Sequence, residues 1–211
     1  MALRILPFRQ YDENDVINLF ALAPGKENDK LTDSGDGDAG VFVTVASGNF
    51  GKDPIEYTTN SYLGKTDYPF VGRNQYPSVT LKCTPAVADA TPVLGITLRQ
   101  TAKTDENGEK LLYNPTKKEE AMAVLPGQAV PIATKGVFTL ADTVTATHFT
   151  NHAVGTGLKI SAESGKVTGC APSDANRIGI VIGTGDRTAA TESDQFAGTG
   201  TSKYLVVALG L

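Results

Sequence analysis

Six short apolar segments, each bounded by turn residues, fill the last third of this 211-residue chain. Successive segments follow one another at intervals of about 8–12 residues or somewhat more, and strands at such intervals are typical of a β-sandwich or a small barrel. The segments are AVPIAT (129–134), GVFTLA (136–141), GLKISA (157–162), GKVTGC (165–170), RIGIVIG (177–183) and KYLVVALG (203–210). The sequence therefore predicts an all-β fold, either a β-sandwich or a small jelly-roll-like β-barrel.

Turn residues suggest how some of these strands connect. Lys135-Gly136 predicts a turn between the first two segments, and Gly155–Gly157 and Ser164-Gly165 predict turns around the next two. RIGIVIG and YLVVAL are nearly continuous apolar runs, so we expect both faces of these two strands to be buried.

Earlier parts of the chain contain further strand candidates at 16–22, 41–46, 78–86 and 92–102. The dipeptide Asn107-Gly108 predicts a hairpin turn. Residues 117–125 form the one helical candidate, with an extended conformation as the alternative. The 22 glycines and 11 prolines agree with a chain rich in turns.

In two regions the apolar side chains follow neither the spacing of a helix nor the alternation of a strand. The first dozen residues predict an extended N-terminal arm, and residues 51–77 predict a long loop that carries several aromatic side chains. Aromatic loops bury against a partner or pack on their own domain, and both alternatives stay open here. The candidate interface residues are Leu3, Ile5, Leu6, Phe8 and Arg9 in the arm and Tyr62, Tyr68, Phe70 and Tyr76 in the loop.

An acidic, glycine-rich stretch occupies residues 25–40 and predicts an exposed loop. Asp33, Asp36 and Asp38 lie close together there, and clustered carboxylates are ligands that calcium prefers. Because their spacing fits no known calcium loop and three carboxylates rarely complete the shell, a solvated loop is the favoured interpretation.

No other stretch carries a complete chemical motif. His148 and His152 would share a face only on a helix, and the segment HFTNH lies between strands, so surface histidines are favoured over a metal pair. GTGDRT (183–188) and GTGTSK (198–203) lack the lysine spacing and helix of a phosphate loop and are interpreted as turns. Cys83 and Cys170 lie in strand-like segments, where free thiols are favoured over a disulfide. We therefore expect no enzymatic activity, no cofactor and no bound metal.

The net charge of −4 argues against a protein that coats nucleic acid, which needs a basic surface. No stretch approaches the roughly 18 apolar residues that a transmembrane helix needs. MALRILPFRQ has neither the apolar core nor the cleavage site of a secretory signal, so we expect synthesis in a cytosol-like compartment.

The second half of the chain resembles the phage capsid decoration, or cement, proteins. The resemblance covers residues 93–211 and rests on VLGITL (93–98), VLPGQAVPIATKGVFTL (124–140), GTGLKISAESGKVT (155–168), RIGIVIGTG (177–185) and KYLVVALGL (203–211). Within these segments the residues that match the family pattern are Gly127, Val130, Pro131, Ala133, Gly136, Val137, Gly165, Val167, Thr168, Ile178 and Gly179.

This resemblance implies a structural virion protein that is made in the host cytoplasm and lies on the capsid exterior. Its partners would be the major capsid protein and other copies of itself, as a homo-dimer or homo-trimer at local symmetry axes, with no nucleic acid and no membrane. Residues 1–90 would form the arm and a β-rich elaboration and residues 91–211 the decoration domain, or the two would form one continuous domain. The alternatives are another virion β protein, from the tail, the head–tail junction or a receptor-binding module, and a sugar-binding or hydrolase β domain.

Overall fold

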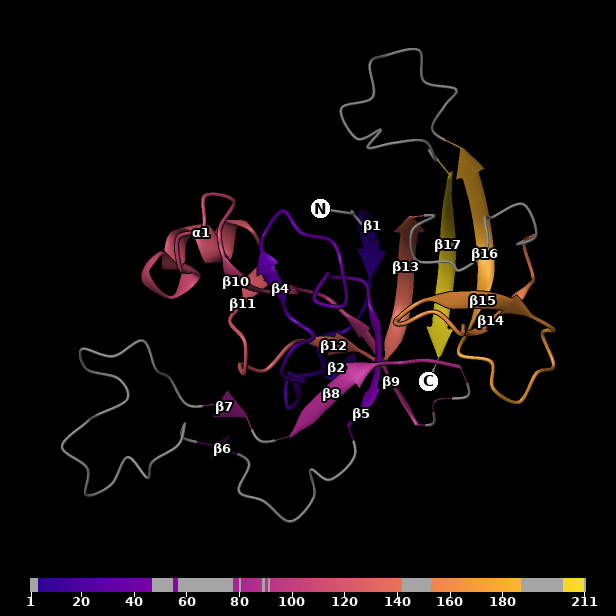
Figure 1. Cartoon of the computed structure of the whole chain (residues 1–211). Coiled ribbons are helices and arrows are strands. Elements are labelled where there is room, and N and C mark those ends of the chain that lie inside the picture. The colour runs from indigo at the N-terminus through magenta and orange to yellow at the C-terminus, as the bar shows by residue number, and fades with distance from the viewer. Residues whose placement is uncertain are drawn as a thin grey trace.

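A computed structural model of the chain describes residues 4–46, 55–56, 78–79, 81–88, 90, 92–141, 153–186 and 203–210. Within these ranges nearly all regular structure is β, which confirms the predicted fold class (Figure 1). The single described α-helix has six residues. No helix in these ranges is long and apolar enough to span a membrane.

The elements follow one another as short strands, with two 3-10 helices and one α-helix between them. The strands before residue 90 are β1 (Ile5–Gln10), β2 (Val16–Ile17), β3 (Ala21–Leu22), β4 (Asn28–Lys30), β5 (Phe42–Val45), β6 (Ile55–Glu56), β7 (Ser78–Val79) and β8 (Lys82–Pro85). The later strands are β9 (Val93–Thr97), β10 (Gln100–Thr104), β11 (Ala123–Val124), β12 (Ile132–Ala133), β13 (Lys135–Ala141), β14 (Gly157–Ile160), β15 (Val167–Cys170), β16 (Gly179–Asp186) and β17 (Lys203–Gly210). The helices are η1 (Glu13–Asp15), η2 (Leu111–Tyr113) and α1 (Pro115–Glu120).

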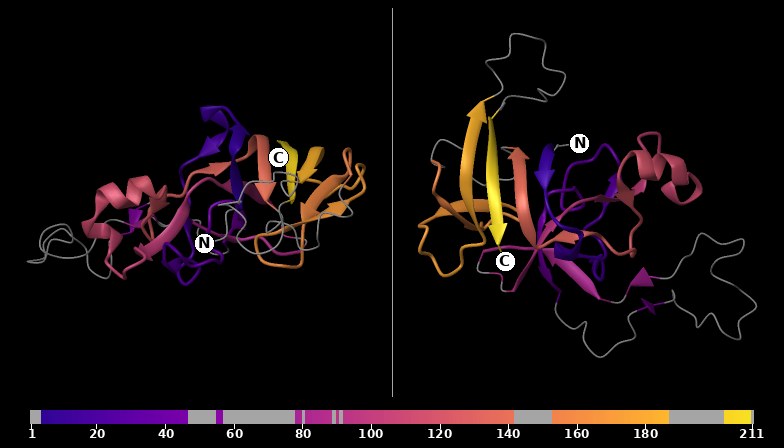
Figure 2. Two further views of the ribbon diagram at one scale, coloured as in Figure 1. Left: turned by 90° about the horizontal axis from the view of Figure 1, so that it is seen from above. Right: turned by 180° about the vertical axis from the view of Figure 1, so that it is seen from behind.

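Two curled six-stranded sheets form the body of the molecule. Sheet A has the order β1-β13-β17-β16-β14-β15 and is antiparallel throughout, whereas sheet B has the order β2-β12-β9-β5-β8-β3 and contains one parallel pair, β3 and β8. A three-stranded parallel sheet, β11-β10-β4, and α1 lie at one end of the elongated molecule, and β14 and β15 lie at the other (Figures 1 and 2).

Each large sheet contains strands from both sides of residue 90. In sheet A, β1 pairs with β13, and in sheet B, β5 pairs with β9. This is the arrangement that one continuous domain has, and the division at residue 90 stays a prediction.

The main core lies between the two sheets. Phe138, Leu140, Leu205 and Val207 of sheet A are fully buried there, and Phe42 belongs to the same cluster from sheet B. The opposite face of sheet B buries a second cluster, which includes Val41, Val43, Cys83 and Ile132. Alternate residues of β5 therefore enter different cores, as the pleat of a strand requires.

Gly95 allows β12 to approach β9 closely. A Cβ built on Gly95 would lie 2.1 Å from the Ala133 carbonyl oxygen, well inside contact distance. Only glycine therefore permits the pairing in which Ile96 faces Ala133 and Thr97 faces Ile132.

The predicted turn at Lys135-Gly136 is wrong. Both residues lie in β13, and the chain bends one residue earlier, at Thr134. Thr134 donates to the Asp15 carbonyl oxygen from both its backbone N–H, at 2.9 Å, and its hydroxyl, at 3.0 Å. The chain thereby leaves sheet B after β12 and enters sheet A as β13, so this segment links two sheets instead of forming a hairpin.

Burial on both faces, predicted for the last two strands, is also wrong. Along β17, Leu205, Val207 and Leu209 are buried, while the alternating Val206 and Ala208 are only partly buried. In β16, Ile182 is 48% exposed at a register irregularity between Val181 and Gly183. The inward face of sheet A meets the core, whereas on the outward face Thr139 is buried and Val206 and Ala208 remain partly exposed.

The remaining predicted strands are confirmed with adjusted bounds. Residues 16–22 divide into β2 and β3, and residues 92–102 divide into β9 and β10, with a bend at Leu98 and Arg99. The predicted turns at Asn107-Gly108 and Ser164-Gly165 are present, and β14 and β15 form the expected antiparallel pair.

The predicted helix is shorter than expected. It begins after Asn114, whose side chain accepts from the Lys117 N–H, and it ends at Glu120. The apolar residues Ala123 and Val124 continue as a strand because their backbone pairs with β10.

Candidate protein-interaction site

The described part of the predicted arm is a strand of the chain's own sheet. Residues 5–10 are extended, as expected, and form the edge strand β1 against β13. Ile5 and Leu6 are 7% and 5% exposed, so they contribute to the core of this chain. Phe8 is 76% exposed, and Arg9 is partly buried with its guanidinium 5.9 Å from the Tyr11 ring centroid. The other candidate interface residues, Leu3, Tyr62, Tyr68, Phe70 and Tyr76, lie outside the described residues.

An apolar row crosses the outward face of sheet A. Val137 of β13 faces Ala208 of β17, which in turn faces Ile180 of β16. All three side chains are partly buried, in contrast to the fully buried row of Phe138, Val207 and Val181 beside them. Apolar side chains that line up across a sheet and stay partly exposed are candidates for a surface that binds another protein where they belong to a larger apolar patch.

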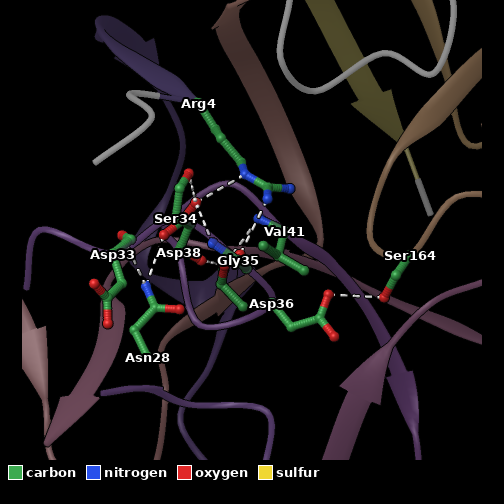
Figure 3. Close-up of polar contacts among 10 residues, drawn as sticks. Arg4, Asn28, Asp33, Ser34, Gly35, Asp36, Asp38, Val41 and Ser164 are labelled. Carbon is green, nitrogen blue, oxygen red and sulfur yellow. Dashed lines mark hydrogen bonds and ion pairs between the residues drawn. The ribbon is translucent and has the colours of Figure 1, made fainter. Parts of the chain in front are cut away.

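The acidic stretch at residues 25–40 does not form the fully exposed loop that was expected. Asp38 is 3% exposed and Asn28 is 6% exposed, and the stretch includes the short strand β4. The expectation was wrong because Arg4 is buried beside Asp38, with its Nε 3.2 Å from Asp38 Oδ2 (Figure 3). A buried carboxylate persists only when it is paired and hydrogen-bonded.

Four donors surround the Asp38 carboxylate. Besides Arg4, Asn28 Nδ2 donates to Oδ1 at 2.8 Å, while the Ser34 hydroxyl and the Gly35 N–H both donate to Oδ2 at 3.1 Å. Arg4 Nη2 also donates to the Gly35 carbonyl oxygen at 3.0 Å. We call these five residues, Arg4, Asn28, Ser34, Gly35 and Asp38, the polar cluster. Its hydrogen bonds use both carboxylate oxygens of Asp38.

The polar cluster joins the two sheets. Arg4 directly precedes β1 of sheet A, and Asp38 lies shortly before β5 of sheet B. Nearby, Ser164 in the turn between β14 and β15 donates to Asp36 at 2.8 Å (Figure 3). Lys26 pairs with the same carboxylate at 3.0 Å. Within the described ranges, no three Asp, Glu, His or Cys side chains are grouped so that they could hold a metal ion. The contacts around Asp38 link chain segments that lead into both sheets.

Both cysteines are free thiols, as predicted. Cys83 is fully buried, and this burial raises its pKa to about 12. Cys170 is partly buried, and its pKa is raised first by burial and then by the nearby Asp174 carboxylate. Neither thiol is in the electropositive setting that creates a reactive thiolate.

The other candidate motifs do not contribute a site to the described structure. Gly183–Asp186 of GTGDRT belong to strand β16, so the interpretation of this stretch as a turn is wrong. His148, His152 and residues 198–202 of GTGTSK lie outside the described ranges.

Sequence reasoning missed the buried partnership of Arg4 and Asp38. The only signal was a charged residue inside the apolar run ALRIL and an acidic residue before the apolar run VFVTV. Comparison of the chain with models of known protein families, with curated proteins and with solved structures finds no match.

Proposed function

We propose that this protein is a capsid decoration protein, which binds the outside of a phage head and stabilises contacts between capsomers of the major capsid protein. The observation that carries the proposal is the partly exposed apolar row of Val137, Ala208 and Ile180 on the outward face of sheet A. Together with Phe8 on edge strand β1 and Ile182 on β16, it offers apolar area on a rigid β scaffold.

The architecture suits a protein that acts by adding buried interface. Sheet A is held from behind by the main core, so its outward residues are fixed in place before a partner binds. A standard interface buries about 1,600 Å² in total, and many symmetry-related copies on one particle add avidity to a modest single-site affinity. The resemblance of residues 93–211 to decoration proteins supports the same proposal.

Copy number in purified particles tests the proposal. The experiment is quantitative mass spectrometry of particles from a phage that encodes this chain, with the major capsid protein as the internal standard. A decoration protein occurs in copy numbers comparable to those of the major capsid protein. A handful of copies at one vertex would instead support a tail or head–tail junction component, and absence from the particle would overturn the proposal.

A substitution on the exposed surface tests the contact itself. Deleting the whole arm would remove Ile5 and Leu6 from the core, so loss of binding would not distinguish contact from misfolding. Phe8→Ser avoids this problem because its side chain is 76% exposed, and Tyr113→Ser, at 65% exposure on η2, is the matched control. We expect Phe8→Ser to lower occupancy of heads at a fixed protein concentration and Tyr113→Ser to leave it unchanged.

A further inference from the structure

A groove of about 690 Å³ lies where sheet A, sheet B and the three-stranded sheet meet. Leu98 and Val124, which are 5% and 8% exposed, contribute an apolar lining together with the partly buried Val16. The polar lining comes from Arg9, Tyr11, Glu13 and Asn18 on the segment from β1 to β3 and from Arg99 at the bend between β9 and β10. The groove is open to solvent and its accessible lining is more polar than apolar, which favours a polar or charged ligand over a deeply buried apolar one.

The side chains that line this groove carry two positive charges, on Arg9 and Arg99, and one negative charge, on Glu13. Because Arg99 pairs with Glu119, Arg9 is the lining cation that has no carboxylate partner among the described residues. A positive side chain of this kind on a chain of net charge −4 favours an acidic ligand, because charge complementarity guides such a ligand to it.

Arg9 is held in position and has no carboxylate partner within the described residues. Its guanidinium lies 5.9 Å from the Tyr11 ring centroid, and Tyr11 stacks on the buried Phe138 with ring centroids also 5.9 Å apart. Stacking on an aromatic ring orients a guanidinium while its donors stay available to a carboxylate.

Arg99 can exchange its present partner for a ligand. It pairs with Glu119 at 2.9 Å, and the two side chains are 35% and 57% exposed. Exposed ion pairs contribute little to stability, so replacing Glu119 by a ligand carboxylate costs little.

Met122 supplies an independent sign of a binding role. Its φ of 49° makes it the one non-glycine residue with positive φ among the described residues. It directly follows the helix cap Ala121, a place where glycine is usual because a side chain is strained there. Met122 nevertheless presents a 43% exposed side chain to the groove. Flexible methionines suit surfaces that adapt to apolar groups of a partner, and strain of this kind concentrates at functional sites.

We propose that this groove binds an extended acidic segment of a partner protein, with carboxylates on Arg9 and Arg99 and apolar side chains against Leu98, Val124 and Met122. An extended segment is proposed because its alternating side chains let carboxylates and apolar groups point in different directions along a short length of chain. This inference does not rest on the proposed function, because it concerns the isolated chain and any partner with such a segment.

The test measures the affinity of the purified full chain for a short fluorescent peptide in which Asp and Leu alternate. The reference probe is the same peptide with Lys in place of each Asp. We expect the acidic peptide to bind, the basic peptide to bind far more weakly, and the affinity to fall as salt is added. Arg9→Gln and Arg99→Gln should each weaken binding about tenfold, the effect of losing one charge-assisted hydrogen bond.

Two further variants separate the groove from general charge. Lys30→Gln removes one positive charge from an exposed side chain at the end of β4. Lys30 pairs with Thr104 of β10, whereas the groove residue Val124 pairs with Thr101 of the same strand, so this substitution should leave the affinity for the peptide unchanged. Met122→Gly should weaken binding about threefold while the melting temperature stays equal or rises, since glycine relieves the positive φ.

Several results would overturn the inference. They are equal binding of the acidic and basic peptides, an effect of Lys30→Gln as large as that of Arg9→Gln, or full displacement of the peptide by millimolar inorganic phosphate. The last result would show a site for simple anions. Because no particle is involved, these outcomes are independent of whether the chain decorates a capsid.

Discussion

Strands β13, β16 and β17 of sheet A have seven or eight residues and pair along nearly their whole length, whereas the strands of sheet B have two to five residues. In sheet A, buried and partly exposed residues alternate along β17. In sheet B, both faces are buried. The segment that leads into β5 of this sheet is fixed by the polar cluster through the contact between Arg4 and Asp38. Long antiparallel strands are therefore stabilised by repeated side-chain alternation, while the short strands depend on a few specific contacts between distant residues.

The difference teaches where single substitutions should act most strongly. A regular sheet distributes its stability over many apolar side chains, each of which contributes a moderate amount. A region held by one buried ion pair or one close backbone approach has no such redundancy, because a buried charge without its partner is costly.

Asp38→Ala should give the largest effect and would test the role of the polar cluster. The substitution leaves Arg4 buried without a carboxylate, so we expect the free energy of unfolding to fall by about 4 kcal/mol. Urea denaturation of the purified chain measures this change. Asp36→Ala is the matched control, since its pair with Lys26 and its hydrogen bond from Ser164 are partly exposed, and it should cost about 1 kcal/mol. Equal effects of the two variants would contradict the special role of Asp38.

Gly95→Ala should cost about 3 kcal/mol, because the new methyl group would strike the Ala133 carbonyl and push β12 away from β9. Gly210→Ala is the control, since a Cβ there meets no atom within 4 Å. The measurement is again denaturant unfolding of both variants. If Gly95→Ala left the free energy of unfolding unchanged, sheet B would accept an added methyl group as readily as sheet A does.

Leu205→Ala should lower the free energy of unfolding by about 2.5 kcal/mol, because it opens a cavity in the core under sheet A. Val206→Ala, one residue along the same strand on the outward face, should cost less than about 1 kcal/mol. A thermal melt of each variant compares the two faces of β17. Similar losses from both would indicate that the outward face is covered after all.

The smallest expected effect concerns thiol reactivity. At pH 8 the raised pKa of Cys83, about 12, keeps this thiol protonated, and its burial excludes reagents. Native protein should therefore react with iodoacetamide slowly at Cys170 and not at Cys83, and Cys170→Ser should abolish labelling until denaturant is added. Mass spectrometry of the labelled peptides distinguishes the two sites, and rapid labelling of native Cys83 would show that sheet B opens easily.

Much of the fold could be predicted from local pattern. The β14–β15 hairpin follows from a turn dipeptide between two short apolar strands, and β17 follows from a run of strand-forming residues. The errors lie where distant contacts decide the outcome. The chain bends at Thr134 because this residue bonds to Asp15, which is far away in the sequence. No local feature of KGVFTL reveals that this strand, β13, pairs with both β1 and β17.

The candidate sites could be predicted less well than the fold. Apolar character predicts a contact role equally for Phe8, Ile5 and Leu6, yet Phe8 is highly exposed whereas Ile5 and Leu6 are buried. The contact role of Phe8 stays a prediction. Exposure depends on which side of β1 faces sheet B, and the sequence of an irregular segment does not specify this. The groove was missed entirely, because its lining residues are separated by up to 122 positions, from Arg9 to Pro131.

By itself, the sequence determined that this chain is a β protein with many turns, since strand alternation and turn residues act over a few neighbouring positions. Only the tertiary structure decided that Arg4 neutralises Asp38, that sheet A keeps an apolar outward row, and that Arg9 and Arg99 share one groove. The physical reason is the separation along the sequence over which each effect acts. Backbone preferences act between neighbouring residues, whereas burial and charge pairing depend on which distant segments the completed sheets bring together.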